Sequence, residues 1–470
     1  MNNSKYFTSS DEVFSWLSVF INLERGQKPK SFRIDRMEFL TKLADYPQRC
    51  APSIHIAGSK GKGSVTGMLA AMLTAAGYRA ARYMSPHVAD IRERICLGDS
   101  YFDEEIYCAA GNELREITEQ RLPAQANPLF DSETEEGCEP TYFELLTLFF
   151  FLCARKGNCN VMVVETGMGG RLDSTNVLDP LLSVITLIEL EHTAFLGNTI
   201  AEVAGEKAGI IKHGRPLVLA KQNEEALKIF VKTVKEKSST LLYLPQTAEI
   251  SNIKITPTGT DFIFSFKTDN KTSLQQPLFS GPLAVSIPIP GKVQAENAAL
   301  AIAAVKTAFP QINEDSIKQG LKSLKIPARF EKITPLFIID GAHTPESFSL
   351  CIETFCLLYG EGGVLIFGCA ADKDAAAMAK IAHPHFSGII ITTPGTFKIS
   401  NPRQVYEAFT AQAGREKTQL VADTQEAIKK AVKFANREKE KRLPILGTGS
   451  FYLASEIRKN IDLINSTDNF

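Results

Sequence analysis

A strand, a turn rich in glycine and lysine, and a helix follow one another directly between residues 54 and 77. The apolar run IHIA predicts a buried strand, and SVTGMLAAMLTAAG predicts a helix that ends at Gly77. Between them, GSKGKGS has glycines that let the backbone approach a ligand, followed by the free N–H groups of a helix start. Its spacing is more compact than the common P-loop pattern G-x-x-x-x-G-K-[ST]. The sequence therefore predicts a βα unit with a phosphate-binding turn at residues 58–64.

Apolar strands and helices alternate along most of the remaining chain. Runs such as NVMVVE and LLSVITLIEL occur in the first part, and LFIID, GVLIFG and GIIITT follow in the second. This alternation favours parallel sheets built from βαβ units. Alternating polar and apolar residues at about 240–290 predict a small antiparallel β insertion. We expect an α/β protein of two domains: residues 1–326 with a P-loop-type, mostly parallel sheet flanked by helices, and residues 327–470 with a Rossmann-like fold.

The composition bounds the class of protein and its partners. Of the 470 residues, 44% are hydrophobic and 22% are charged, and the formal net charge is -1. This balance gives no support for a nucleic-acid or membrane partner. The nine cysteines form no C-x-x-C pair, which favours free thiols in a reducing compartment. Because the N-terminus lacks a signal-peptide pattern and the apolar run at 145–154 is too short for a bilayer, we expect a cytoplasmic protein.

Polar side chains follow the predicted strands of the first domain. Ser85 follows the second strand, Glu165 ends the third, and His192 lies after the fourth. Open parallel sheets bind ligands at the carboxyl ends of their strands. Burying a carboxylate such as Glu165 is costly unless a cation or donors meet it, and Mg²⁺ prefers oxygen ligands shared with nucleotide phosphates. Together with Lys62 and Ser64 of the turn, these residues predict a site for a nucleotide and a metal ion.

The second domain repeats this arrangement. Arg329 lies just past the predicted boundary, and Asp340 and His343 follow a strand and precede a helix. Lys207 lies between small residues of a predicted helix in the first domain, where it is either an exposed lysine or part of the site. Together these residues predict a nucleotide held between the two domains, with a metal ion on the first.

Several ordered motifs give the chain a resemblance to a known family. They are AGSKGKGS, YMSPH, ETGMGGRLDSTN, EHTAFLGNTIAEVAGEKAGIIK, VQAENAALAI, PARFE, DGAHTPES and GTGSFYLASEIR. Through these motifs the chain resembles the folylpolyglutamate synthase/dihydrofolate synthase family of Mur-type ligases, from about Phe39 to Ile457. The long glycine signature and the EKAGI block are the most specific of them.

The resemblance implies ATP-dependent formation of an amide. ATP would phosphorylate a carboxylate of dihydropteroate or a (tetrahydro)folate, and the amino group of L-glutamate would attack the acyl phosphate, releasing ADP and phosphate. It also implies that Lys62, Lys207 and His343 are catalytic, that Lys207 is carbamylated, and that the protein is a monomer. The implied ATP-binding residues are Gly58, Ser59, Lys60, Gly61, Lys62, Gly63, Ser64, Asn297, Arg329 and Asp340, and the implied Mg²⁺ ligands are Ser64, Ser85, Glu165 and His192.

Some positions depart from the pattern of the family. Ser59 and Lys60 replace Thr-Asn in the turn, and Glu191 replaces the aspartate of a DHT segment. Val293 replaces a histidine before Gln, and Thr344 replaces the asparagine of DxAHNP. Three interpretations therefore remain: a folate ligase, a Mur-type ligase for another carboxylate such as a cell-wall precursor, and a catalytically silent nucleotide-binding protein. The retained metal and lysine positions argue against the third, and the specific motifs favour the first.

Overall fold

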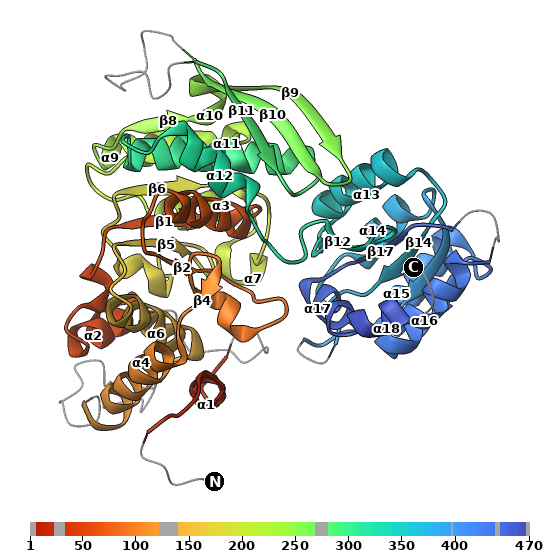
Figure 1. The fold of residues 1–470 in the computed structure, drawn as a ribbon, viewed down its shortest axis with the longest axis horizontal. Helices are drawn as coiled ribbons and strands as arrows, with labels where there is room; N and C mark the ends of the chain where they lie inside the picture. The colour runs from red at the N-terminus through yellow and green to blue at the C-terminus, as the bar shows by residue number, and fades with distance from the viewer. Residues whose placement is uncertain are drawn as a thin grey trace.

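The structure is a computed structural model that describes residues 6–22, 33–121, 140–267, 281–395, 398–437 and 442–466. It contains two α/β domains side by side, each built on a mostly parallel sheet flanked by helices (Figure 1). The expected fold class is therefore confirmed. Among the described residues, no helix combines the length and the apolar character needed to cross a membrane.

The first domain is organised around a sheet of eight strands in the order β4-β3-β2-β5-β1-β6-β7-β8. The strands are β1 (Ser53–Ala57), β2 (Ala80–Tyr83), β3 (Ile95–Leu97), β4 (Ser100–Tyr101), β5 (Val161–Glu165), β6 (Leu182–Ile185), β7 (Leu217–Leu219) and β8 (Leu241–Tyr243). All neighbours from β2 to β8 pair in parallel, whereas β3 pairs antiparallel with β2 and β4. Val161 and Val163 of β5 face one core, and Met162 and Val164 face the other. Burial on both faces explains why this strand is a continuous apolar run.

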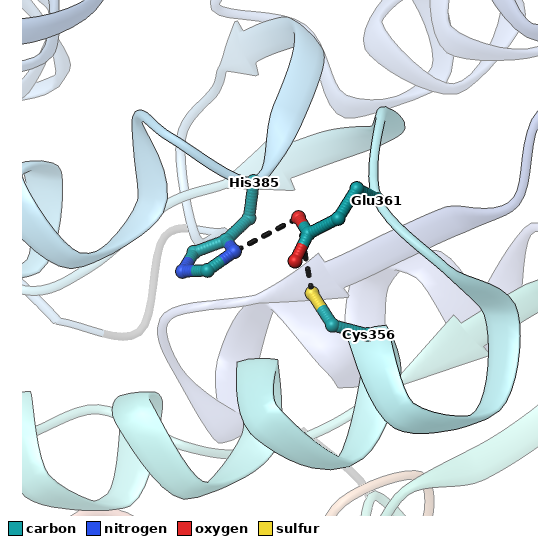
Figure 2. A group of neighbouring side chains, drawn as sticks. All are labelled: Cys356, Glu361 and His385. Atoms are coloured by element: carbon teal, nitrogen blue, oxygen red, sulfur yellow. Dashed lines mark hydrogen bonds and ion pairs between the residues drawn. The ribbon is translucent and has the colours of Figure 1, made fainter.

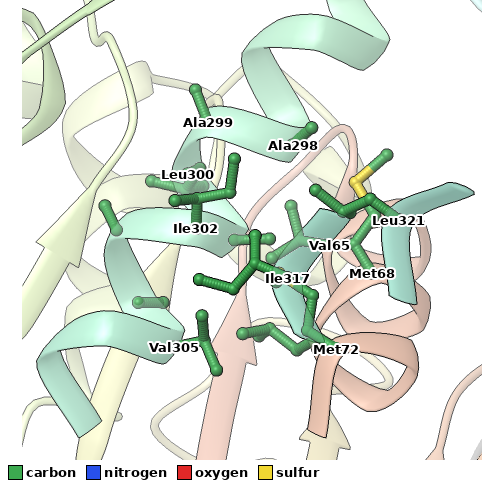
Figure 3. Close-up of a cluster of buried hydrophobic side chains, with 14 of the residues drawn as sticks. Val65, Met68, Met72, Ala298, Ala299, Leu300, Ile302, Val305, Ile317 and Leu321 are labelled. Atoms are coloured by element: carbon green, nitrogen blue, oxygen red, sulfur yellow. The ribbon is translucent and has the colours of Figure 1, made fainter. Parts of the chain in front are cut away.

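Helices cover both faces of this sheet. One face carries α3 (Lys62–Ala75), α11 (Lys292–Ala308) and α12 (Glu314–Lys322). In this core, Val65 and Met68 of α3 lie close to Ile317 and Leu321 of α12 (Figure 3). The other face carries α1 (Ser10–Leu17), α2 (Ile34–Leu43), α4 (Glu104–Glu116) and α6 (Tyr142–Lys156). Three further helices of the domain are α7 (Thr193–Leu196), α8 (Ile200–Ala208) and α9 (Glu224–Glu236).

A separate three-stranded antiparallel sheet follows β8 and the short helix α10 (Leu244–Thr247). Its strands are β9 (Ala248–Thr256), β10 (Gly259–Phe266) and β11 (Leu283–Ile287), with β10 in the middle. Phe262, Phe264 and Val285 share the core that contains α11. In Figure 1 this sheet extends from the first domain toward the second.

The second domain has a six-stranded sheet in the order β12-β13-β17-β14-β15-β16. Only the edge strand β12 (Glu331–Thr334) is antiparallel; the others are β13 (Phe337–Ile339), β14 (Gly363–Phe367), β15 (Phe386–Ile391), β16 (Thr418–Leu420) and β17 (Ile445–Thr448). One core joins the sheet to α13 (Pro345–Tyr359), α14 (Ala375–Ala382) and α15 (Pro402–Ala413). The opposite core contains α16 (Thr424–Ala435), α17 (Phe451–Lys459) and α18 (Ile461–Ser466).

Candidate active site between the two domains

The predicted site residues of the first domain lie at one edge of the large sheet. The neighbouring parallel strands β2, β5, β1 and β6 end, in that order, near Ser85, Glu165, the turn at 58–64 and His192. This edge borders a cleft of about 1580 Å³, which is also lined by Arg329 and neighbouring residues of the second domain. The predicted residues that line the cleft are Ser59, Lys60, Gly61, Lys62, Gly63, Ser64, Ser85, Glu165, His192, Asn297, Arg329, Asp340 and His343.

The turn at 58–64 is shaped by two glycines with positive φ. Gly58 has φ +146° and Gly61 has φ +88°. A Cβ atom on Gly58 would lie 1.8 Å from Oγ1 of Thr186, and one on Gly61 would lie 2.4 Å from Oδ1 of Asn297. Lys62 is the first residue of α3, and its Nζ donates a hydrogen bond to the Gly58 carbonyl at 2.8 Å. The turn therefore closes onto itself and leaves the free N–H groups of α3 available to an anion.

Glu165 is a buried carboxylate with little compensation from its neighbours. Glu165 is 3% exposed, and among the residues that the structure describes only the Ser85 N–H donates to its Oε2, at 3.4 Å. Burial raises the pKa of Glu165 to about 7, although Lys62, the Ser85 amide and Arg329 oppose this shift. A divalent cation would stabilise the ionised carboxylate, and the carboxylate and hydroxyl oxygens nearby are ligands that Mg²⁺ prefers. The residues at this edge therefore fit a divalent cation.

His192 can contribute to such a site because its ring is neutral. It has φ +48° and precedes α7. His192 is exposed on the wall of the cleft, and partial removal of water by the surrounding protein lowers its pKa below the usual value, against the opposing effect of Glu191. A neutral imidazole has a free nitrogen lone pair, which a metal ligand requires.

Lys207 and Gly58 are buried and do not line the cleft. Lys207 Nζ donates to Oε1 of Glu191 at 2.7 Å and to the Gly58 carbonyl at 2.9 Å, and its side chain is 1% exposed. Burial lowers the pKa of Lys207 to about 8. Burial alone would raise the pKa of Glu191, but Lys62 and Lys207 outweigh it and lower this pKa to about 2. In this structure Lys207 therefore links the turn at 58–64 to Glu191, as half of a buried ion pair.

The residues of the second domain are held by local hydrogen bonds. The Arg329 guanidinium lies 4.2 Å from the ring centre of Phe451. Asp340 accepts hydrogen bonds from the backbone N–H groups of Phe330 at 2.7 Å and Ala342 at 2.8 Å, so its carboxylate fixes the loop that carries Arg329. Nδ1 of His343 lies 2.8 Å from the Gly341 carbonyl, and this acceptor assigns the proton to Nδ1. Burial lowers the pKa of His343 to about 3, so the ring is neutral with Nε2 as an acceptor.

Comparisons with known proteins agree with this arrangement. The model of the Mur ligase middle domain matches residues 129–305, and that of the Mur ligase glutamate ligase domain matches residues 328–448. A dihydrofolate synthase/folylpolyglutamate synthase of Bacillus subtilis (strain 168) is 31% identical over 468 residues, covering 97% of this chain and 100% of that protein. The chain belongs to this family.

Solved structures of the family share the fold over almost the whole chain. The structure of Mycobacterium tuberculosis folylpolyglutamate synthase (FPGS) complexed with ADP has a TM-score of 0.82 and 26% identity, covering 96% of this chain and 98% of that chain. An FPGS-AMPPCP-folate complex has a TM-score of 0.79 and 27% identity, covering 97% of this chain and 100% of that chain. The expected membership of the FPGS/dihydrofolate synthase family of Mur-type ligases is confirmed.

The FPGS-type cleft of this chain is also lined by Asp173, a buried carboxylate that the sequence did not single out. Asp173 accepts hydrogen bonds from the backbone N–H groups of Met168, at 2.8 Å, and Thr175, at 3.0 Å. Nε2 of the buried His55 lies 2.8 Å from the Thr175 hydroxyl. The D-S-T sequence is a signal for such a turn, because aspartate side chains bond the backbone two residues on.

A second overlooked group is a buried ion pair at the edge of the cleft. Arg36 Nε lies 2.8 Å from a carboxylate oxygen of Glu144, with side-chain exposures of 7% and 5%, and both residues line the cleft. Glu144 also receives the Thr141 N–H at 2.7 Å. The two partners are 108 positions apart, so only the fold brings them together.

Proposed function

We propose that the chain is an ATP-dependent ligase that adds L-glutamate to dihydropteroate, to a (tetrahydro)folate, or to both. The main support for this proposal is that Gly63 of α3, Glu165 of β5 and Arg329 of the second domain lie close together. A Cβ atom on Gly63 would lie 3.5 Å from Oε2 of Glu165 and 3.7 Å from Nη2 of Arg329. A phosphate there would meet a helix N-terminus, an arginine of the second domain and a carboxylate suited to a cation. The related FPGS complex with AMPPCP and folate supports these ligand classes.

The first step joins two anions and needs positive charge around it. An oxygen of the acceptor carboxylate attacks the γ-phosphorus of ATP, the bond from that phosphorus to the bridging oxygen breaks, and ADP leaves. Repulsion between the phosphate and the carboxylate has to be offset by fixed positive groups. Lys62 and Arg329 supply such groups from the two walls of the cleft, and the N–H groups of the turn add partial positive charge. Mg²⁺, with Glu165, Ser64, Ser85 and His192 as its ligands, would supply further positive charge at the phosphates.

The second step forms the amide. The neutral amino group of L-glutamate attacks the carbonyl carbon of the acyl phosphate and a tetrahedral intermediate forms. Inorganic phosphate then leaves with the bonding electrons, and the nitrogen releases one proton to solvent. We assign His343 to the incoming amine, because Nε2 of its neutral ring can accept an amine proton in a hydrogen bond. Asp340 acts indirectly on both steps, because it accepts hydrogen bonds from the N–H groups of Phe330, next to Arg329, and of Ala342, next to His343.

Carbamylation of Lys207 belongs to this proposal. The reaction needs the neutral amine, and burial lowers the pKa of Lys207 to about 8, so a minor neutral fraction exists near pH 7. A carbamate would place a negative group beside Glu191, so the Lys207–Glu191 ion pair has to open first. Mass spectrometry of the intact protein prepared in bicarbonate, compared with bicarbonate-free buffer, tests this modification.

We further propose that the protein acts as a monomer in the cytoplasm. The eight described cysteines are free thiols, which supports a reducing compartment. Sedimentation analysis tests the oligomeric state.

A phosphate-release assay tests the proposed function. Purified protein with Mg²⁺, ATP and L-glutamate is offered dihydropteroate or tetrahydrofolate in separate reactions, and mass spectrometry follows addition of a glutamyl residue. We expect phosphate release that depends on both glutamate and at least one acceptor. Turnover with a muramoyl-type carboxylate but with neither pterin acceptor would contradict a folate ligase, and a lack of turnover with all acceptors would favour a silent nucleotide-binding protein.

A further inference from the structure

Three side chains of different donor types meet in the second domain, outside the cleft (Figure 2). Nδ1 of His385 lies 2.9 Å from Oε2 of Glu361, and Sγ of Cys356 lies 3.7 Å from the same oxygen. The three potential ligand atoms all lie within 4.8 Å of one another. None of these residues lines the cleft that we assign to ATP and folate. The group therefore has no part in the proposed ligase reaction.

The backbone fixes the positions of these side chains. Cys356 lies in the last turn of α13, Glu361 in the turn after it, and His385 directly before β15. The Gly360 N–H donates to the Cys356 carbonyl at 2.9 Å, and the Gly362 N–H donates to the His385 carbonyl at 2.9 Å. Gly360 and Gly362 have φ of +82° and +87°, so the tight turn depends on glycine at these positions. The donor atoms are thus brought together by a hydrogen-bonded frame.

A surface ion pair alone does not explain why these three side chains lie together. The Glu361 side chain is 63% exposed and that of His385 is 33% exposed, and ion pairs at such exposed positions contribute little to stability. The Cys356 thiol is less accessible, and burial, together with Glu361, raises its pKa to about 12. In the metal-free protein the thiol therefore keeps its proton and donates it toward Glu361.

The donor set selects the kind of ion. One sulfur, one imidazole nitrogen and one carboxylate oxygen suit Zn²⁺, whereas Mg²⁺ prefers oxygen alone. Metal–ligand bonds of about 2.0–2.3 Å in a tetrahedron place the donor atoms roughly 3.3–3.7 Å apart. The contact between Sγ and Oε2 already has this length, and Nδ1 and Oε2 need to separate by a few tenths of an ångström.

We propose that Cys356, Glu361 and His385 bind one Zn²⁺ ion, with water as the fourth ligand. On binding, the Cys356 thiol releases its proton to solvent, and no oxidation or reduction takes place. In the metal-free protein the contact with the Glu361 carboxylate assigns a proton to Nδ1 of His385. On binding, Nδ1 gives up this proton to solvent and binds the metal, and the neutral ring keeps a proton on Nε2, which points away from Glu361 in Figure 2. The ion joins the end of α13 to the start of β15.

Cobalt substitution tests the site with a readout that is independent of ligase activity. Metal-free protein is titrated with Co²⁺ in excess Mg²⁺, and near-ultraviolet absorption is recorded for the charge-transfer band of a cobalt–thiolate bond. We expect a band that saturates at one equivalent and disappears when Zn²⁺ is added. Cys356→Ser should abolish the band, and Glu361→Gln or His385→Gln should weaken binding roughly tenfold or more.

Two variants serve as matched controls. Cys50→Ser removes an exposed cysteine, and His383→Gln removes a neighbouring histidine that is outside the group. Both should keep the wild-type band and affinity. Absence of the band in the wild type, or an equal band in Cys356→Ser, would overturn the proposal. Circular dichroism of each variant checks that it is folded, and failure of the ligase assay would leave this result unaffected.

Discussion

Replacing Glu165 by glutamine tests whether this carboxylate is buried without a sufficient partner. Its pKa is 4.5 when unperturbed and about 7 in the folded protein. That difference corresponds to about 3 kcal/mol of unfolding free energy. Because the folded-state pKa is raised, protonation of Glu165 favours the folded wild type. This contribution to the unfolding free energy is fully present below pH 4.5 and is lost as the pH rises through 7. Glutamine has nearly the same shape and never ionises, so Glu165→Gln should be more stable than the wild type at pH 8, by up to about 3 kcal/mol.

Urea unfolding without divalent cations measures this difference. The free energies of the two proteins should be similar at pH 4, and the variant should become more stable between pH 5 and 8. Glu407→Gln, at an exposed position of α15, is a matched control and should follow the wild type at every pH. A Glu165→Gln variant that is no more stable than the wild type at pH 8 would refute the argument. The same variant should lose ligase turnover, because it lacks the carboxylate that we assign to Mg²⁺.

Other predictions concern the turn and the Lys207–Glu191 ion pair. Lys207→Met removes the ion-pair partner of the Glu191 carboxylate and leaves Lys62 as the remaining nearby cation, so urea unfolding should show a loss of about 3 kcal/mol. Adding Glu191→Gln should restore most of this loss. An equal loss in the double variant would contradict the ion-pair account. Gly58→Ala should cost about 2 kcal/mol or more and weaken AMPPCP binding, because its Cβ would clash with Thr186 at a positive φ. Gly205→Ala, in α8 with open space around it, should instead stabilise the protein by about 0.5–1 kcal/mol, and the opposite order would refute the geometric argument.

Much of the fold follows from local patterns in the sequence. The run NVMVVE predicts β5 because a strand covered on both faces has to be apolar throughout, and GSKGKGS predicts the turn before α3. The short strands β3, β4, β12 and β16, of two to four residues each, were not predicted. Such strands are too short to show a periodicity and depend on pairing with a neighbour.

The candidate site could be predicted where strand ends bring residues together. Parallel strands place Ser85, Glu165 and His192 at one edge, and this follows from the order of the strands. The pairing of Lys207 with Glu191 could not be predicted, because a helical lysine reveals neither its burial nor its partner. The group around Cys356 was also missed, since its spacing matches no known metal motif and depends on the contact between two loops.

Transfer of labelled oxygen tests the central claim most directly. The acceptor is prepared with ¹⁸O in the carboxylate that receives glutamate, and the phosphate released in the presence of ATP, Mg²⁺ and L-glutamate is analysed by mass spectrometry. An acyl phosphate requires one carboxylate oxygen to leave with the phosphate, so we expect one ¹⁸O atom in each phosphate released. Phosphate without the label, released while the glutamyl product forms, would contradict carboxylate activation in this cleft.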